Sequence, residues 1–388
     1  MKIPVTLANC ADYSTETVTA AIERLMEPLG GMAAFVRPGQ RVLLKPNMLS
    51  GKEPQRAVTT HPEIVRAVIR LAQDAGGRVA VGDSPGVGSP LQVARRCGIL
   101  AVIEETGADF APFSESVTIR PKGSTFRELE IARDILDAEV IINLPKLKTH
   151  QMMGLTCGVK NLFGAVVGMR KPRLHLQAGS DKAFFALMLL ELAEQIAPAL
   201  TLVDAVTAME GNGPGSGDPV HVGALLASPS PLAVDTVVCQ LLGIESCQVW
   251  TQKVAAASHR FGSRRDQVAL FGTAPELLRA ASFRPAKQTE VNFGLPDWLL
   301  APLKQSLSAQ PRVDPQYCVL CGLCVRHCPP RIMAIVKGSL RIDYSRCIGC
   351  FCCQELCPQG ALHTRQGLLL RLGSLLKSRR NGCGGGKE

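Results

Sequence analysis

The sequence CVLCGLCVRHCP at residues 318–329 is repeated as CIGCFCCQELCP at residues 347–358. Each copy has cysteines at its first, fourth, seventh and eleventh positions, and a proline directly after the last. Three thiolates at two-residue gaps can bind three corners of one [4Fe-4S] cubane, and the chain then runs past it, so the fourth corner must be filled from elsewhere. The repeat therefore predicts a bacterial-type ferredoxin module with two [4Fe-4S] clusters.

In this type of module the fourth cysteine of each copy binds the other cluster. We therefore expect cluster one to be held by Cys318, Cys321, Cys324 and Cys357, and cluster two by Cys347, Cys350, Cys353 and Cys328. The two halves then cannot fold independently. Paired CxxC motifs also suit zinc, but zinc has no use for the third cysteine or the repeated proline. Cys352 lies between two ligands, and we interpret it as a free thiol near the cluster.

Length and composition describe a globular protein of two or three domains, with 388 residues of which 46% are hydrophobic. The longest strongly apolar stretch, residues 183–192, is far shorter than the roughly 20 residues of a membrane span, so we expect a buried helix and no transmembrane segment. Residues 1–10 carry no export signal, and fifteen cysteines favour metal ligation in a reducing compartment. A cytoplasmic location is expected.

The positive charge is concentrated at the ferredoxin end. Net charge is +10, and from Arg312 onward 12 Lys/Arg face 4 Asp/Glu, which leaves a formal +2 for the first 311 residues. An oxidised cubane with its four thiolates carries about −2, so part of this excess is counter-charge for the clusters. The remainder favours an acidic redox partner protein, or weak contact with an anionic membrane surface. Nucleic acid is not expected, because aromatic residues are only 4% of the chain and no binding motif is present.

Residues 1–295 alternate β-rich apolar runs with segments of helical period. Strands are expected at residues 41–45, 78–82, 139–144, 200–205 and 221–227, and helices at 182–196 and 232–242. Thr60 to Glu63 resembles a capping box, and Ser89 and Pro90 suit the start of another helix. This alternation predicts an α/β domain with a largely parallel sheet.

The rest of the chain divides into three parts. We expect a linker at 296–311 with a short amphipathic helix around Trp298, and an α+β ferredoxin-like domain at 312–366. A basic amphipathic tail at 367–388 is expected to pack back on the protein, with an anionic membrane surface as the alternative.

Polar residues gather just after the predicted strands, where a parallel α/β sheet binds its ligands. If residues 145–150 are extended, period two places Lys146, Lys148 and His150 on one side, and these three are the candidate catalytic residues. The candidate substrate-binding residues are Lys45, Asn47, Asp83, Ser84, Lys160, Asn161, Asp204, Glu210 and Asn212.

Several lysines beside a helix N-terminus would bind an anionic small molecule that carries a phosphate or carboxylate. The alternative is a buried network in which the lysines pair with Asp83, Asp204 and Asp235. We favour the ligand site, because a fold rarely buries four lysines without function. His61 is assigned to the capping motif, and His150 and His175 are the better histidine candidates, although each alone is a weak signal. The Gly-rich loop 211–217 lacks the ending of a P-loop and fits a mobile loop at the mouth of a site.

Five stretches together resemble the domain-of-unknown-function family 362, whose members often carry a ferredoxin module downstream. They are LKPN (44–47), VGDSPG (81–86), NLPKLKTH (143–150), GVKNLFG (158–164) and MEGNGP (209–214), within a similarity that spans residues 42–243. Cys157 stands before GVKN, where a small residue is expected. The resemblance implies an iron-sulfur protein and assigns no reaction.

Two hypotheses follow for the function. The chain is an oxidoreductase that relays electrons from an external donor to an anionic substrate or centre bound by the N-terminal domain. Alternatively, it is a ferredoxin-type carrier or assembly partner whose N-terminal domain docks another protein. A purely structural role for the clusters is disfavoured, because low-potential clusters are sensitive to oxygen.

Overall fold

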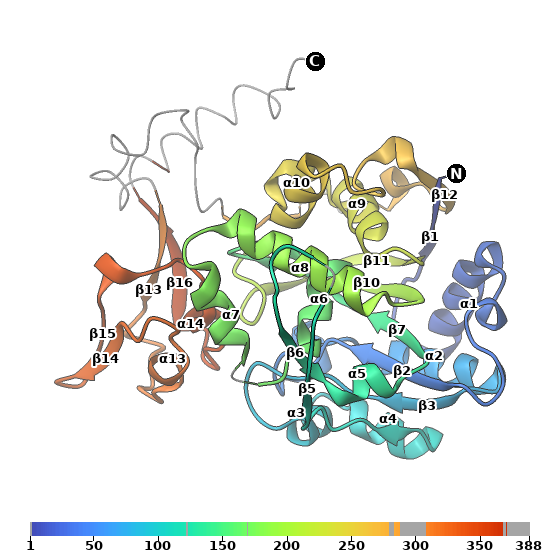
Figure 1. Cartoon of the computed structure of the whole chain (residues 1–388), viewed down its shortest axis with the longest axis horizontal. Coiled ribbons are helices and arrows are strands. Elements are labelled where there is room, and N and C mark those ends of the chain that lie inside the picture. Colours follow the sequence, from blue (N-terminus) through green and yellow to red (C-terminus); the bar gives the residue numbers. More distant parts are fainter. Residues whose placement is uncertain are drawn as a thin grey trace.

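The computed structural model describes residues 2–121, 123–168, 170–278, 283–287, 308–367 and 370. Within these residues the N-terminal part folds around a ten-stranded sheet with the order β12-β1-β11-β10-β7-β2-β3-β4, shown in Figure 1. The strands are β1 Ile3–Asn9, β2 Arg41–Pro46, β3 Arg78–Val81, β4 Asp109–Phe110, β7 Val140–Leu144, β8 Lys146–His150, β9 Gly154–Thr156, β10 Leu200–Glu210, β11 Asp218–Ser228 and β12 Val268–Gly272.

Most strand pairs in this sheet are parallel. The run β4-β3-β2-β7-β10 is parallel throughout, and β12 is parallel to β1. Strand β11 is antiparallel to both of its neighbours, β1 and β10. Strand β8 runs parallel to β10, and β9 pairs with β8 in the antiparallel sense. The predicted α/β domain with a largely parallel sheet is confirmed.

Helices cover both faces of the sheet, and successive strand residues therefore enter different cores. Leu202 and Leu225 pack with α1 to α4, whereas Val203 and Leu226 pack with α9 on the other side. The helices are α1 Thr15–Met26, α2 Pro62–Asp74, α3 Pro90–Arg96, α4 Ile99–Thr106, α5 Arg133–Asp137, α6 Gly158–Asn161, α7 Arg170–Ala178, α8 Lys182–Ile196, α9 Pro231–Leu242 and α10 Trp250–Ala257. Burial on both faces explains why these strands read as nearly continuous apolar runs.

Several predicted elements have the expected bounds, and two differ. Helix α8 spans the predicted residues and is buried, and α3 begins after Ser89, whose hydroxyl accepts a hydrogen bond from the Gln92 amide. Strands β10 and β11 are longer than predicted, because a register shift at residues 205–207 lets their pairing continue to Glu210. Within the described ranges, no helix combines the length and the apolar character needed to cross a bilayer.

The predicted capping box at residues 60–63 is wrong. His61 caps α2 instead, and its ring nitrogen accepts a hydrogen bond from the Glu63 amide at 3.2 Å. The Thr60 hydroxyl donates to the Leu144 carbonyl at 2.6 Å and accepts from the Asn47 amide at 2.8 Å. Thr60 therefore joins two strand ends, a contact that the local sequence does not reveal.

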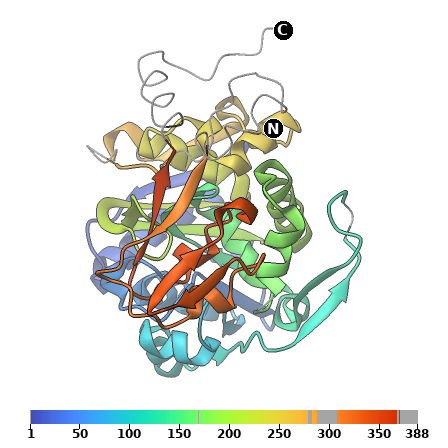
Figure 2. The same cartoon turned by 90° about the vertical axis from the view of Figure 1, so that its left-hand side faces the viewer.

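Shorter elements complete the α/β domain. Strands β5 Ser116–Ile119 and β6 Leu129–Ala132 form a hairpin that extends from the domain in Figure 2. The 3-10 helices are η1 Glu27–Leu29, η2 Met32–Ala34, η3 Pro54–Arg56, η4 Leu162–Ala165, η5 Ser246–Gln248, η6 Arg265–Gln267 and η7 Pro275–Leu277.

The C-terminal module is built from two short halves that repeat the same backbone turns. Strand β13 Ala309–Val313 pairs antiparallel with β16 Leu362–Gln366, and β14 Met333–Val336 pairs antiparallel with β15 Ser339–Ile342. Helices α13 Leu323–Arg326 and α14 Cys352–Glu355 each follow a left-handed residue, Gly322 and Phe351, and the 3-10 helix η9 covers Tyr344–Arg346. The predicted ferredoxin-like repeat is thus present in the backbone as well as in the cysteines.

The second half of this module packs against the α/β domain. The Gln354 amide donates to the Asn212 side-chain oxygen at 2.6 Å, and the Lys52 ammonium donates to the Pro358 carbonyl at 2.6 Å. Cys350, Phe351 and Cys352 belong to the same apolar core as α6 and α8. The predicted helix around Trp298 and residues 371–388 of the predicted tail lie outside the described residues.

Candidate functional site

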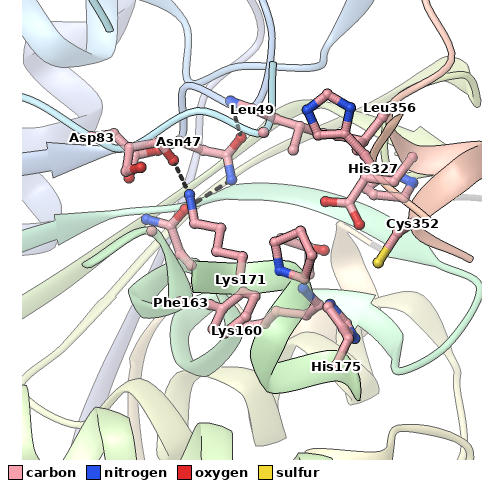
Figure 3. Close-up of a pocket in the computed structure, with 18 of the residues that line it drawn as sticks. Asn47, Leu49, Asp83, Lys160, Phe163, Lys171, His175, His327, Cys352 and Leu356 are labelled. Atoms are coloured by element: carbon pink, nitrogen blue, oxygen red, sulfur yellow. Dashed lines mark hydrogen bonds between the residues drawn. The ribbon is translucent and has the colours of Figure 1, made fainter. Parts of the chain in front are cut away.

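A cavity lies between the carboxyl edge of the sheet and the ferredoxin module, and Figure 3 shows its lining. The empty space between its walls is about 750 Å³, a value that includes solvent at the open side. The α/β domain contributes residues that follow β2 and β3, together with residues of β8, β9, α6 and α7. The module contributes His327, Cys352, Glu355 and Leu356. A ligand in this cavity would therefore contact both parts of the chain.

Two of the predicted lysines lie behind the wall of the cavity, in buried ion pairs. Lys45 Nζ is 2.8 Å from Asp83 Oδ1 and also donates to the Asn161 carbonyl at 2.6 Å. Lys146 Nζ is 2.9 Å from Asp204 Oδ2 and donates to the Tyr13 hydroxyl at 2.7 Å. For Lys45 and Lys146 the structure matches the alternative of a buried polar network.

Three other lysines line the cavity, and within the described residues none of them has a carboxylate within ion-pair distance. Lys148 Nζ donates to Asn47 Oδ1 at 3.0 Å and to the Val58 carbonyl at 2.7 Å. Lys160 Nζ lies 5.3 Å from the centre of the Phe163 ring. Lys171 Nζ donates to the carbonyls of Ser84 and Pro85. The cavity therefore gathers cationic side chains from β8, α6 and α7.

Burial makes these ammonium groups unusually easy to deprotonate. Desolvation lowers the pKa of Lys148 to about 7 and the pKa of Lys171 to about 8. Desolvation also lowers the pKa of Lys160, against the opposing charge of Glu355. An anion in the cavity would replace the lost solvation of these charges and raise the pKa of the amines again.

Two histidines near the cavity are neutral at physiological pH. Burial lowers the pKa of His150 to about 4 and that of His175 to about 3. His150 Nδ1 accepts from the amides of Met152 and Met153, so its proton sits on Nε2, which is 3.6 Å from Glu355 Oε2. His175 stacks on Phe185 with ring centres 4.2 Å apart.

Two polar atoms of the lining have no partner within the described part of the chain. They are His175 Nδ1 and Thr156 Oγ1, both buried. Buried polar atoms are nearly always hydrogen-bonded, so an orphaned pair in one cavity wall is a further sign of a ligand site.

The other sequence candidates divide between the cavity and its surroundings. Asn47, Asp83, Ser84, Lys148, Lys160 and Asn161 line the cavity, whereas Lys45, Lys146, His150, Asp204, Glu210 and Asn212 do not. Glu210 pairs with Arg284 at 2.6 Å, and Asn212 contacts the ferredoxin module through Gln354. Polar residues at strand ends serve structural contacts as well as ligand binding, and local sequence does not separate the two uses.

Sequence reasoning did not select Thr156, Lys171 and Glu355, and it named His175 only as a weak signal; all four line the cavity. Lys171 and His175 are four residues apart on α7, a spacing that places both on one helix face and that could have identified them together. Glu355 lies between Cys353 and Cys357 of the cysteine motif, and that motif predicts only the cluster ligands. Cys157 is buried beside Asp235, and burial together with that charge raises the pKa of its thiol well above the usual range.

The eight motif cysteines form two groups in the module. Cys318, Cys321, Cys324 and Cys357 line a second pocket that is partly open to solvent, three of them from the first half and one from the second. Burial raises the pKa of Cys353, and the nearby thiols of Cys350, Cys347, Cys328 and Cys324 raise it further, so the four cysteines predicted for cluster two lie close together and also close to Cys324 of the other set. No three His, Cys, Asp or Glu side chains in the described ranges can hold a single metal ion. The first group instead surrounds an open space, as ligands of a cubane do.

The position of Cys352 shows how close the second group of thiols lies to the cavity. Cys352 is buried, lies in the cavity lining, and sits in sequence between Cys350 and Cys353. The second group of thiols is therefore next to the lysine-lined cavity.

Comparison with known proteins identifies both parts. Residues 42–240 match the family model described as domain of unknown function (DUF362), and residues 310–358 match a 4Fe-4S dicluster domain. The thylakoid-associated protein sll1697 of Synechocystis sp. (strain ATCC 27184 / PCC 6803 / Kazusa) is 41% identical over 296 residues, which cover 76% of this chain and 88% of that protein.

Among solved structures, the likeness is low. The lactate racemase apoprotein of Thermoanaerobacterium thermosaccharolyticum gives a TM-score of 0.39 at 11% identity, over 61% of this chain and 56% of that one. A protein from Thermotoga maritima gives a TM-score of 0.33 at 12% identity, over 55% and 54% of the two chains. These values carry no argument about activity. On the family match and the identity to its relative, this chain belongs to the DUF362 family and carries an iron-sulfur-binding 4Fe-4S dicluster domain downstream of it.

Proposed function

We propose that this protein is an oxidoreductase that binds an anionic substrate beside an iron-sulfur centre. Two [4Fe-4S] clusters would be held by the crossed ligand sets, Cys318, Cys321, Cys324 and Cys357 for one, and Cys347, Cys350, Cys353 and Cys328 for the other. When bound, they supply one-electron transfer. The observation that carries the proposal is the shared cavity wall, because Cys352 and Glu355 face the lysines and lie beside ligand Cys353.

The lining describes the substrate class. The lining has more cationic than anionic side chains. Three lysines, Lys148, Lys160 and Lys171, stand against one unpaired carboxylate, Glu355, because Asp83 is already paired with Lys45. This excess of positive charge suits a phosphate or carboxylate group. The lining also contains apolar side chains, from Leu49, Phe163, Pro172, Pro214 and Leu356. A substrate with an anionic group and an apolar body fits both the positive charge and the apolar side chains of the lining.

The chain can also supply protons at the site. A substrate that gains electrons gains basicity, and a donor works best when its pKa lies near the ambient pH. Lys148 Nζ meets that condition, because burial lowers its pKa to about 7 and its amine is held by Asn47 and Val58. The ferredoxin module covers one side of the cavity and reduces the access of water.

Removing a cavity lysine should weaken anion binding and leave the clusters intact. Within the described residues Lys160 Nζ makes no hydrogen bond and lies over the Phe163 ring, so we expect Lys160→Ala to weaken binding of the preferred anion about 10- to 100-fold, the range for one charge-assisted contact. Isothermal titration calorimetry without oxygen, with inorganic phosphate and a series of carboxylates, would measure this. Lys253→Ala, at an exposed lysine on α10, is the matched control.

The same experiment separates the two functional hypotheses. If neither Lys160→Ala nor Lys171→Ala changes anion binding or turnover, while both cluster signals persist, the enzyme proposal fails. The carrier or assembly-partner hypothesis would then be the better one. Mass spectrometry of small molecules that co-purify anaerobically would identify the ligand.

Anion affinity should fall as the pH rises. The anion binds the protonated amines, whose pKa values in the free protein are about 7 for Lys148 and about 8 for Lys171. The charged groups around them are Glu355, Lys160, Asp83, Lys45 and Lys146. Affinity should therefore be full below about pH 7 and should decrease up to about tenfold per pH unit and per amine above these values. Calorimetry in buffers of different ionisation enthalpy should show proton uptake on binding, and an affinity that stays constant from about pH 6 to 9 would contradict the assignment.

A further inference from the structure

Within the described residues, the first group of cysteines is the more exposed of the two. Cys321 of the first group is exposed and its three partners are half-buried, whereas in the second group only Cys347 is half-buried and Cys328, Cys350 and Cys353 are at most 8% exposed. The second group is covered by the α/β domain, because Cys350 and Cys352 pack into the same core as α6 and α8. Electron transfer slows steeply with distance, so the exposed Cys321 marks where an external donor comes closest to a cluster ligand.

Apolar side chains surround this accessible group. Tyr317, Val319, Leu320, Ile335 and Val336 are between 37% and 62% exposed, and all but Val336 line the cavity of the four cysteines. We call these five residues the cluster-one patch. Figure 1 shows that the β14–β15 hairpin, which carries two of them, projects at the end of the molecule remote from the sheet. Contiguous exposed apolar residues of this kind mark contact sites for other proteins.

The exposed charges of the ferredoxin module indicate the charge of a partner protein. Seven Arg and Lys side chains of the described module are exposed, at Arg312, Arg326, Arg331, Lys337, Arg341, Arg346 and Arg365. The described module has three acidic residues, Asp314, Asp343 and Glu355. Glu355 lines the lysine cavity, and Asp343 is paired with Arg346 at 3.0 Å. Lys337 directly follows Ile335 and Val336 in the hairpin turn. Cluster charge lies inside the module, so an approaching protein meets the basic side chains first.

We propose that the cluster-one patch is the docking surface of a small acidic electron-transfer protein, which exchanges single electrons with the chain there. The inference rests on the proposed function for the presence of clusters. An apolar surface next to Lys337, on a module with an excess of exposed basic side chains, provides both the short contact and the electrostatic attraction that such transient complexes use. Electrons enter at this end of the module, and substrate is bound at the other.

The test uses anaerobic full-length protein and a flavodoxin as the probe, which is a small acidic protein carrying FMN. Its fully reduced flavin gives up one electron, and the chain gains that electron, which stopped-flow absorbance records. We expect the rate to fall at least tenfold in Ile335→Asp and in Lys337→Glu, because both add negative charge at the patch. Reduction by dithionite, which needs no docking, should be unchanged. Leu136→Asp is the control, since Leu136 is 44% exposed on α5 of the α/β domain.

Wild-type protein gives a second measurement that requires no variant. The flavodoxin rate should fall steeply between low and high salt, while the dithionite rate should not follow it. If clusters are present and dithionite reduces them, but the flavodoxin rate is the same in patch variants, in the control and at all salt concentrations, the docking surface is wrong and the proposed function stands. If the purified protein contains no iron and sulfide, both proposals fail.

Discussion

Replacing Cys318 and Cys357 together is expected to remove one cluster and leave the other, although the two residues lie in different copies of the motif. Crossed ligation places both in the same ligand set, and the structure groups them around one cavity. The double variant Cys318→Ala/Cys357→Ala should keep about half of the wild-type iron, or about four atoms per chain. Iron and sulfide analysis, with paramagnetic resonance after dithionite treatment, would measure this.

The informative comparison is the double variant Cys318→Ala/Cys328→Ala. Both of these residues come from the first copy, so crossed ligation predicts that each cluster loses one ligand and that most of the iron is lost. Ligation within each copy predicts the opposite outcome for the two double variants. Cys352→Ala is the matched control, because its thiol lies outside both sets and both clusters should remain.

Replacing Lys45 by methionine is expected to destabilise the α/β domain by about 3–5 kcal/mol. Lys45 is fully buried, and its removal leaves Asp83 Oδ1 without its cation at 2.8 Å and the Asn161 carbonyl without a donor. An uncompensated buried carboxylate is far less favourable than a paired one. Urea unfolding monitored by circular dichroism would measure the change, with Lys2→Met at an exposed lysine as the control.

Removing both charges provides the complementary measurement. Lys45→Met/Asp83→Asn should recover part of the lost stability, because no buried charge is left unpaired. Equal stability of Lys45→Met and wild type would show that Lys45 is not a structural lysine. It would then belong with Lys148, Lys160 and Lys171, whose replacement affects binding more than folding.

The local sequence pattern was sufficient to predict structure wherever a segment determines its own conformation. The bounds of α8, the cap at Ser89 and the repeated turns of the ferredoxin module follow from residue types at fixed spacing. The cap of α2 did not follow, because the Thr60 hydroxyl bonds to Leu144, 84 residues away. A short-range motif is overridden when a distant backbone group offers a buried partner.

The sequence by itself determined the cluster motif, the α/β class, and a set of lysines at strand ends. It could not tell which lysines are paired and which face a ligand, because Asp83 and Asp204 reach Lys45 and Lys146 only through the order of strands in the sheet. It also could not place Lys171 and His175 opposite Glu355, which is 184 and 180 residues further along the chain. The site is made by packing the ferredoxin module onto the carboxyl edge of the sheet. Such long-range packing depends on shape and buried area over the whole surface, and no local pattern records it.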